Sequence, residues 1–174
     1  MAITPDVKDW TCVLERACAE CGFDAKRFRR DEIGRAIREN AAAWPPLLAR
    51  GDVRERARED AWWCLEYACH VRDVYRIFDE RLALMLDEDG PSFQNWDQDE
   101  TALRDRHDLQ GPASVATELV SAATRHAARY DAVADDQWTR PGARSNGSRF
   151  TVETLGVYGL HDPIHHLWDV TSTR

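Results

Sequence analysis

The sequence lacks the features of a membrane protein or an exported one. The 174-residue chain has no run of 18 apolar residues, and its first residues show no basic region followed by an apolar stretch. The first absence argues against a membrane-spanning helix and the second against a secretory signal. Its five cysteines are an odd number, which does not suit a disulfide framework. We therefore expect a cytoplasmic protein with reduced thiols and no membrane partner.

The chain also lacks an excess of positive charge. The formal net charge is −8, with 31 acidic against 23 basic residues. Because a nucleic-acid backbone needs a basic face on its partner, nucleic acid is not expected to bind. The length and the 43% apolar content are enough for a single hydrophobic core. We expect one domain that covers residues 1–174 and acts on a small molecule.

The spacing of apolar residues predicts an all-α protein. Residues 1–28 are expected to form an extended lead-in and residues 29–171 a helical bundle. The predicted helices run from Phe28 to the Pro45-Pro46 pair and over 59–86, 112–133 and 150–170. A long polar crossover is expected over 91–110, and a loop over 135–149. Four helices with one long crossover form a four-helix bundle, in which facing helices supply the residues of a metal or ligand site.

Three histidines are the candidate metal ligands. His161 and His165 are four residues apart, which places them one turn apart on the same face of a helix. His70 lies on the apolar stripe of the helix predicted over 59–86, where an unpaired imidazole would be costly to bury. Three imidazoles with open coordination positions are typical of a catalytic metal site. The alternative is that these histidines are hydrogen-bonded residues of the core.

The other histidines of the chain are less specific candidates. His166 is rotated by about 100° from His165, so it is expected beside the metal ligands or at the surface. His107 and His126 stand in polar segments and are expected to be exposed. His161-Asp-x-x-His165 also resembles the His-Glu-x-x-His protease motif, but the acid is Asp162 and Pro163 interrupts the motif.

Asp162, His166 and Asp73 are candidates for the surroundings of the metal site. Asp73 could orient His70 by accepting a ring N–H, or it could be a solvated charge. The aromatic candidates for a pocket are Tyr67, Tyr158, Trp63 and Trp168, whose alternative role is core packing.

One cysteine pair stands out in the lead-in. Cys18-Ala-Glu-Cys21 is a single C-x-x-C, and a zinc knuckle would need a second pair of ligands, which the sequence does not show. Two interpretations stay open: reduced, half-buried thiols, or a local metal clip or redox pair.

Two motifs resemble those of the DinB/YfiT-like superfamily. They are Trp63-Cys-Leu-Glu-Tyr-Ala-Cys-His70-Val-Arg-Asp-Val and Tyr158-Gly-Leu-His161-Asp-Pro-Ile-His165-His166, and Asn95-Trp-Asp-Gln-Asp and Arg149-Phe-Thr-Val-Glu-Thr-Leu extend the likeness to an actinobacterial branch. The resemblance covers about Asp9 to Val170. It implies a four-helix bundle with a crossover, metal ligation by His70, His161 and His165, and a homodimer. Relatives in this superfamily include S-transferases and maleylpyruvate isomerase, which use mycothiol, bacillithiol or glutathione.

The functional expectation is a metal-dependent enzyme. A divalent ion, zinc or nickel with manganese or iron as alternatives, would lower the pKa of a bound thiol or water and create a nucleophile. The reaction would be a thiol S-transfer, an isomerisation or a hydrolysis of a small molecule, with a low-molecular-weight thiol such as mycothiol as a possible cosubstrate. The alternative is a metal-binding or small-molecule-binding protein without turnover.

Overall fold

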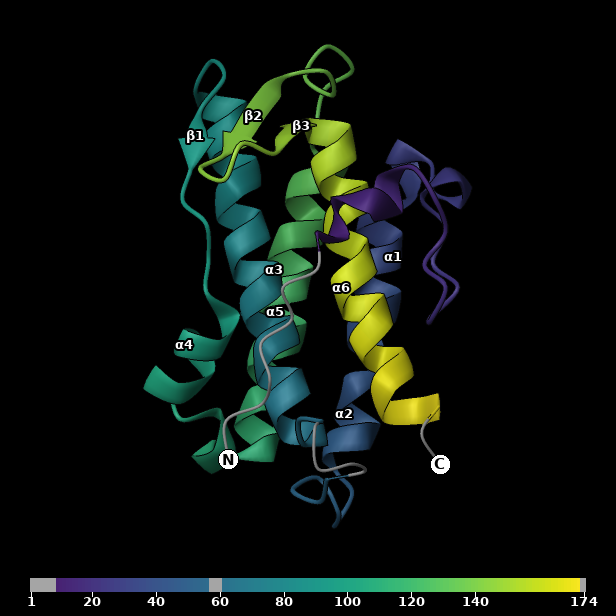
Figure 1. Cartoon of the computed structure of the whole chain (residues 1–174), viewed down its shortest axis with the longest axis vertical. Helices are drawn as coiled ribbons and strands as arrows, with labels where there is room; N and C mark the ends of the chain where they lie inside the picture. The colour runs from purple at the N-terminus through teal and green to yellow at the C-terminus, as the bar shows by residue number, and fades with distance from the viewer. Residues whose placement is uncertain (1–8, 57–60, 173–174) are drawn as a thin grey trace.

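The protein is built from long helices and a few short strands. The computed structural model describes residues 9–56 and 61–172. The helices of this part are α1 (Ile33–Ala42), α2 (Trp44–Leu48), α3 (Cys64–Asp87), α4 (Gln98–Arg104), α5 (Pro112–Asp131) and α6 (Val152–Ser172). The strands are β1 (Ser92–Phe93), β2 (Pro141–Arg144) and β3 (Arg149–Thr151). Figure 1 shows α3, α5 and α6 along the long axis of the molecule.

Helices α1, α3, α5 and α6 form the bundle. α3 packs on both α5 and α6, and α1 packs on the same two helices from the other side. α3 and α5 run up the view of Figure 1 while α1 and α6 run down, so the chain must return the length of the bundle between α3 and α5. The predicted four-helix bundle with one long crossover is therefore confirmed. No helix in residues 9–56 or 61–172 has the length and hydropathy of a bilayer-spanning segment.

Local sequence explains where the long helices begin. The backbone N–H of Trp63 donates to the Glu66 carboxylate at 2.8 Å, which closes the first turn of α3. The predicted start of this helix, Glu59, lies outside the described residues. Pro112 stands in the first turn of α5, where its missing N–H costs no helical hydrogen bond. Pro45 and Pro46 likewise lie in the first turn of α2, so they begin a new helical turn after α1 ends.

Two connections differ from the sequence-based expectation. The crossover contains the helix α4, and the segment predicted as a loop over 135–149 supplies β2. β1 pairs with β2 in parallel and β2 pairs with β3 antiparallel, so a small sheet covers one end of the bundle. Strands of two to four residues are too short to show the apolar alternation by which strands are recognised. For this reason the sequence does not predict the sheet.

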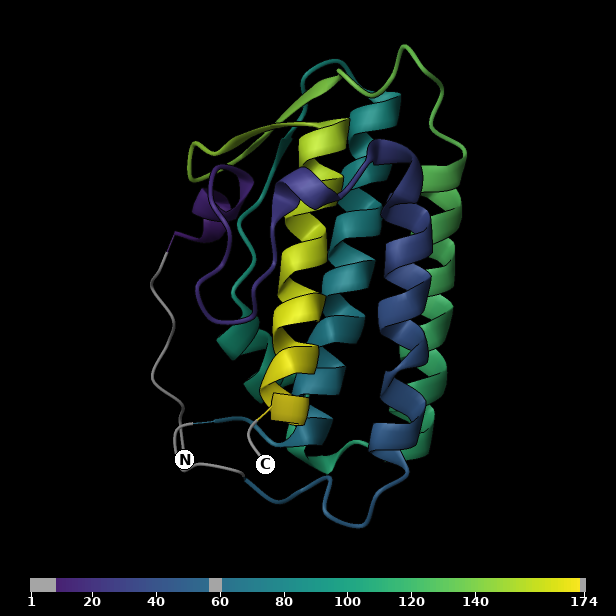
Figure 2. The same cartoon turned by 90° about the vertical axis from the view of Figure 1, so that its right-hand side faces the viewer.

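The lead-in lies along one side of the bundle. Figure 2 shows the N-terminal segment and the crossover against α6 and α3, on the side away from α1 and α5. The lead-in was expected to be extended, but it includes 3₁₀ turns at Trp10–Leu14 and Ala25–Arg27. The first of these turns packs on α6. The lead-in thereby brings its side chains to the helix that carries the histidine pair.

Candidate metal centres

α6 carries two pairs of potential metal ligands. His161 and His165 form one pair and Asp162 and His166 the other, each with a spacing of four residues. Because neighbouring positions on a helix differ by about 100°, the two pairs point in different directions. Asp162 and His166 face His70 on α3, while His161 and His165 face the lead-in.

His70, Asp162 and His166 form the first group, which we call the open cluster. One donor atom from each residue lies within 4.8 Å of those of the other two. His70 Nε2 is 3.0 Å from Asp162 Oδ1, and His166 Nε2 is 3.6 Å from the same oxygen. Two ligand atoms that are each about 2.1 Å from a metal, with a right angle between the two bonds, would also be about 3.0 Å apart. Two imidazoles and a carboxylate therefore fit a divalent transition metal.

Access to solvent distinguishes the open cluster. His70 is fully buried, but 34% of the Asp162 side chain and 18% of the His166 side chain are exposed. Burial would raise the pKa of Asp162, but the nearby His70 and His166 outweigh it, so that pKa lies well below its ordinary value. Asp162 is thus an anion at neutral pH, as a metal ligand must be.

Aromatic rings and a second carboxylate hold the histidines of the open cluster. The Trp96 ring stacks on His70 with 5.3 Å between centroids, and Trp62 lies 5.2 Å from it on another side. His166 Nδ1 lies 2.9 Å from Asp169 Oδ2, so with its proton on Nδ1 the ring donates there. This assignment leaves Nε2 with a lone pair, and carboxylates commonly orient metal-binding histidines in this way.

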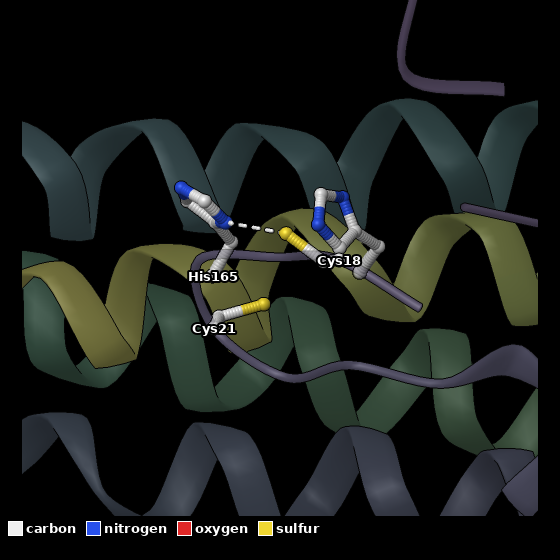
Figure 3. Close-up of side chains that lie close together, drawn as sticks. Cys18, Cys21 and His165 are labelled. Carbon is white, nitrogen blue, oxygen red and sulfur yellow. Dashed lines mark hydrogen bonds between the residues drawn. The ribbon is translucent and has the colours of Figure 1, made fainter. Parts of the chain in front are cut away.

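Cys18, Cys21, His161 and His165 form the second group, which we call the thiol cluster. One donor atom from each lies within 4.8 Å of those of the others. Cys18 Sγ is 3.7 Å from His165 Nδ1, as Figure 3 shows. Cys18, His161 and His165 are all less than 9% exposed. Burial raises the pKa of the Cys21 thiol to about 11.

The three predicted histidine ligands are thus divided between the two groups. His161 and His165 lie together, as their spacing predicts, with ring centroids 5.2 Å apart. His70 belongs to the open cluster instead, beside Asp162 and His166. From the sequence, these last two residues were expected only in the surroundings of the site. As a single ligand set, His70, His161 and His165 stays a prediction.

The other predicted pocket residues are also divided. Tyr67 lies 4.8 Å from the His166 ring and Trp168 lies 5.8 Å from the His165 ring. Tyr158 stands one turn before Asp162 and packs on Phe150. Trp63 contacts Arg56 instead, and the neighbouring Trp62 is the ring that packs on His70.

Asp73 belongs to a separate ionic network. It pairs with the guanidinium groups of Arg72 and Arg76 and lies 3.1 Å from His107 Nε2. It therefore orients His107, and the structure shows no bond from it to His70. His107 and His126 were expected to be exposed, which is wrong: each is at most 3% exposed. Their acidic partners lie on α3, far from them in the sequence. The polar residues around the two histidines therefore do not indicate these partners.

Asn40 is a buried residue that no sequence pattern singled out. Its side-chain N–H donates to the Pro163 carbonyl at 2.9 Å, while its Oδ1 accepts from Tyr75 and from Trp44. Pro163 lies between the members of both ligand pairs. The amide therefore ties α1 and α3 to the part of α6 that carries the candidate ligands.

Comparison with known proteins identifies the fold. No protein-family model and no curated protein matches the sequence. The fold of the bundle is nevertheless similar to that of a solved structure. That structure is YfiT from Bacillus subtilis, described as a probable metal-dependent hydrolase with an unusual four-helix bundle topology. The TM-score is 0.74 over 83% of this chain and 85% of that one, at 19% identity. The likeness confirms the fold that the motifs imply, while the actinobacterial branch stays a prediction.

Proposed function

We propose that this protein is a metal-dependent hydrolase of small molecules, with its metal held by His70, Asp162 and His166. The observation that carries the proposal is the open cluster itself. Two facing helices bring three donor atoms within 4.8 Å of one another, and two of the three side chains remain partly exposed. Three protein ligands with room for a further one are typical of catalytic metal sites. The description of YfiT as a probable metal-dependent hydrolase supports the same class.

The roles of the surrounding residues follow from their contacts. A divalent metal in this cluster would lower the pKa of a water or thiol at its open position. Trp96 and Trp62 fix the plane of His70, and Asp169 fixes the ring of His166. The carboxylate and the two neutral imidazoles leave one positive charge on a site with a divalent ion, which favours an electron-rich substrate group. Zinc and nickel, with manganese and iron as alternatives, accept these nitrogen and oxygen donors.

Two arginines near Tyr158 support an anionic substrate. The Arg144 guanidinium lies 3.4 Å from the Tyr158 hydroxyl, and Tyr158 stands one helical turn before Asp162. The pKa of Arg81 is lowered to about 10, by burial first and then by Arg144. Neither guanidinium is paired with a carboxylate within 4.0 Å among the described residues. We propose that they attract a substrate carboxylate or phosphate toward the open cluster.

The rival ligand set is the three-histidine one. His70, His161 and His165 would use the thiol-cluster imidazoles, whereas the proposed set uses Asp162 and His166. Asp162→Ala and His166→Ala therefore separate the two: each should abolish metal-dependent turnover if the open cluster is the site. His126→Gln, which alters a buried histidine elsewhere, is the control. Full turnover in both open-cluster variants would refute the assignment.

The assay also separates the proposed reaction from its alternatives. Protein stripped with a chelator would be reloaded with zinc, nickel, manganese or iron and tested on anionic esters and amides, with and without mycothiol or glutathione. The proposal expects metal-dependent turnover without thiol. Turnover only with thiol would indicate S-transfer, and stoichiometric metal without turnover of any substrate would indicate a binding protein. Arg144→Gln should raise KM for anionic substrates and leave kcat unchanged.

A further inference from the structure

The loop that holds Cys18 and Cys21 is shaped to present both sulfurs together. Gly22 follows directly, with a φ of +73°, a conformation that glycine adopts without strain. Its N–H donates to the Cys18 carbonyl at 3.0 Å, and the Cys18 N–H donates to the Phe23 carbonyl at 2.8 Å. The chain therefore reverses tightly around the cysteines. Figure 3 shows their sulfur atoms near each other, beside the ring of His165.

The distances suit tetrahedral coordination of a zinc ion. Zinc bonds of about 2.3 Å to sulfur and about 2.0 Å to nitrogen, at a tetrahedral angle, place the two ligand atoms about 3.5 Å apart. The observed separation of Cys18 Sγ and His165 Nδ1 is 3.7 Å. The remaining donors, from Cys21 and His161, lie within 4.8 Å. The spacings Cys-x-x-Cys and His-x-x-x-His are those of zinc sites with two cysteines and two histidines.

The surroundings complete the geometry of a closed site. His165 directs Nδ1 to the cysteines, while its Nε2 lies 3.5 Å from Glu20 and 3.9 Å from Asp169. Carboxylates at the far nitrogen are the usual second partners of zinc-bound histidine. Trp10 packs on both histidine rings, at 4.9 Å and 5.2 Å, and so restricts access of water.

We propose that Cys18, Cys21, His161 and His165 bind a structural zinc ion that fastens the lead-in to α6. Each thiol would release its proton to solvent on binding, and two thiolates with two neutral imidazoles would balance the charge of the ion. Charge balance matters because an uncompensated ion is costly to bury. This site is distinct from the open cluster. It fills all four positions with protein ligands, so its role is to hold the fold together.

The test begins with the unaltered protein. Protein purified under reducing conditions and loaded with zinc should retain one tightly held equivalent beyond that of the open cluster, as measured by elemental analysis. With cobalt in its place, a thiolate-to-metal charge-transfer band should appear in the near ultraviolet, with the intense visible bands of tetrahedral cobalt. Cobalt bound without a thiolate band, or a Cys18–Cys21 disulfide that persists in the metal-loaded protein, would overturn the proposal.

Variants assign the site to its residues. Cys18→Ser and Cys21→Ser should each lose one zinc equivalent and the thiolate band, while Cys12→Ser, in the same segment, should lose neither. His70→Ala should keep the band, so failure of the proposed enzyme site and failure of the zinc site are distinguishable. A Cys21→Ser variant with unchanged zinc content and cobalt spectrum would refute the assignment. The cobalt spectrum of the unaltered chain decides the question even if a cysteine variant does not fold.

Discussion

The two ligand pairs of α6 have the same helical spacing but different surroundings. Asp162 and His166 meet one histidine of α3 and stay partly exposed, whereas His161 and His165 meet two thiols of the lead-in and are buried. Three donors with an open side are suited to chemistry, and four donors in a closed shell are suited to structure. A shift of one position along the same helix thus separates two kinds of site. The spacing alone could not reveal this difference.

The largest expected effect comes from removing one ligand from each cluster in turn. His70→Ala should reduce turnover to the background rate, because it removes a ligand of the open cluster, and should leave the zinc of the thiol cluster in place. Cys21→Ser should lose that zinc and retain measurable turnover. Elemental analysis measures the metal content, and initial rates measure the turnover of the same preparations. Equal loss of both metals in both variants would show that the clusters are not independent.

Removal of metal should affect stability through the thiol cluster. Metal that binds only the folded state stabilises it by about 4 kcal/mol when free metal is about 1,000 times Kd. Chelation should therefore lower the free energy of unfolding by some kcal/mol, while the helical circular dichroism remains, since the bundle has its own core. The loss should be smaller in Cys18→Ser, which has already lost the thiol-cluster ion and keeps only the contribution of the open cluster. Complete unfolding on chelation would instead make zinc a requirement of the fold.

Asp169 offers a smaller perturbation of the open cluster. Its carboxylate accepts from His166 Nδ1, so Asp169→Ala should free the ring and weaken metal binding by roughly 10- to 100-fold. Competition with a chromophoric chelator measures that affinity. Glu20→Ala is the matched control, because Glu20 faces His165 and belongs to the thiol cluster. A larger effect of Glu20→Ala on turnover would contradict the division of roles.

The smallest effect concerns a buried histidine outside both clusters. Burial lowers the pKa of His126. Asp79 offsets only part of this lowering, and Arg129 and Arg125 add to it. Its contribution to stability is therefore present above the ordinary pKa of 6.5 and is lost as pH falls through the lower folded value. His126→Gln should flatten the decline of the unfolding free energy below pH 6.5. Denaturant titrations at several pH values test this; an unchanged slope would refute it.

Sequence patterns predict the bundle well because long amphipathic helices repeat their signal over many turns. α5 and α6 begin within two residues of their predicted starts. The candidate site is harder to predict from the sequence, since it depends on the rotation of α6 and on where the lead-in lies. Cys18 and Cys21 gain a second ligand pair only because residues more than 130 positions away come beside them. Trp96, in a crossover predicted as polar, could not be assigned to His70. The expected homodimer and the cytoplasmic location stay predictions.

The position of Asp169 has a consequence for how the two clusters respond to each other. Its carboxylate lies 2.9 Å from His166 and 3.9 Å from His165, so a single side chain faces one ring of each cluster. If an ion in the thiol cluster draws His165 into place and thereby shifts this carboxylate, the affinity of the open cluster changes by some factor. Thermodynamic linkage then requires an ion in the open cluster to change the affinity of the thiol cluster by that same factor. Titrating each metal in the presence and absence of the other would give the coupling free energy carried by one carboxylate.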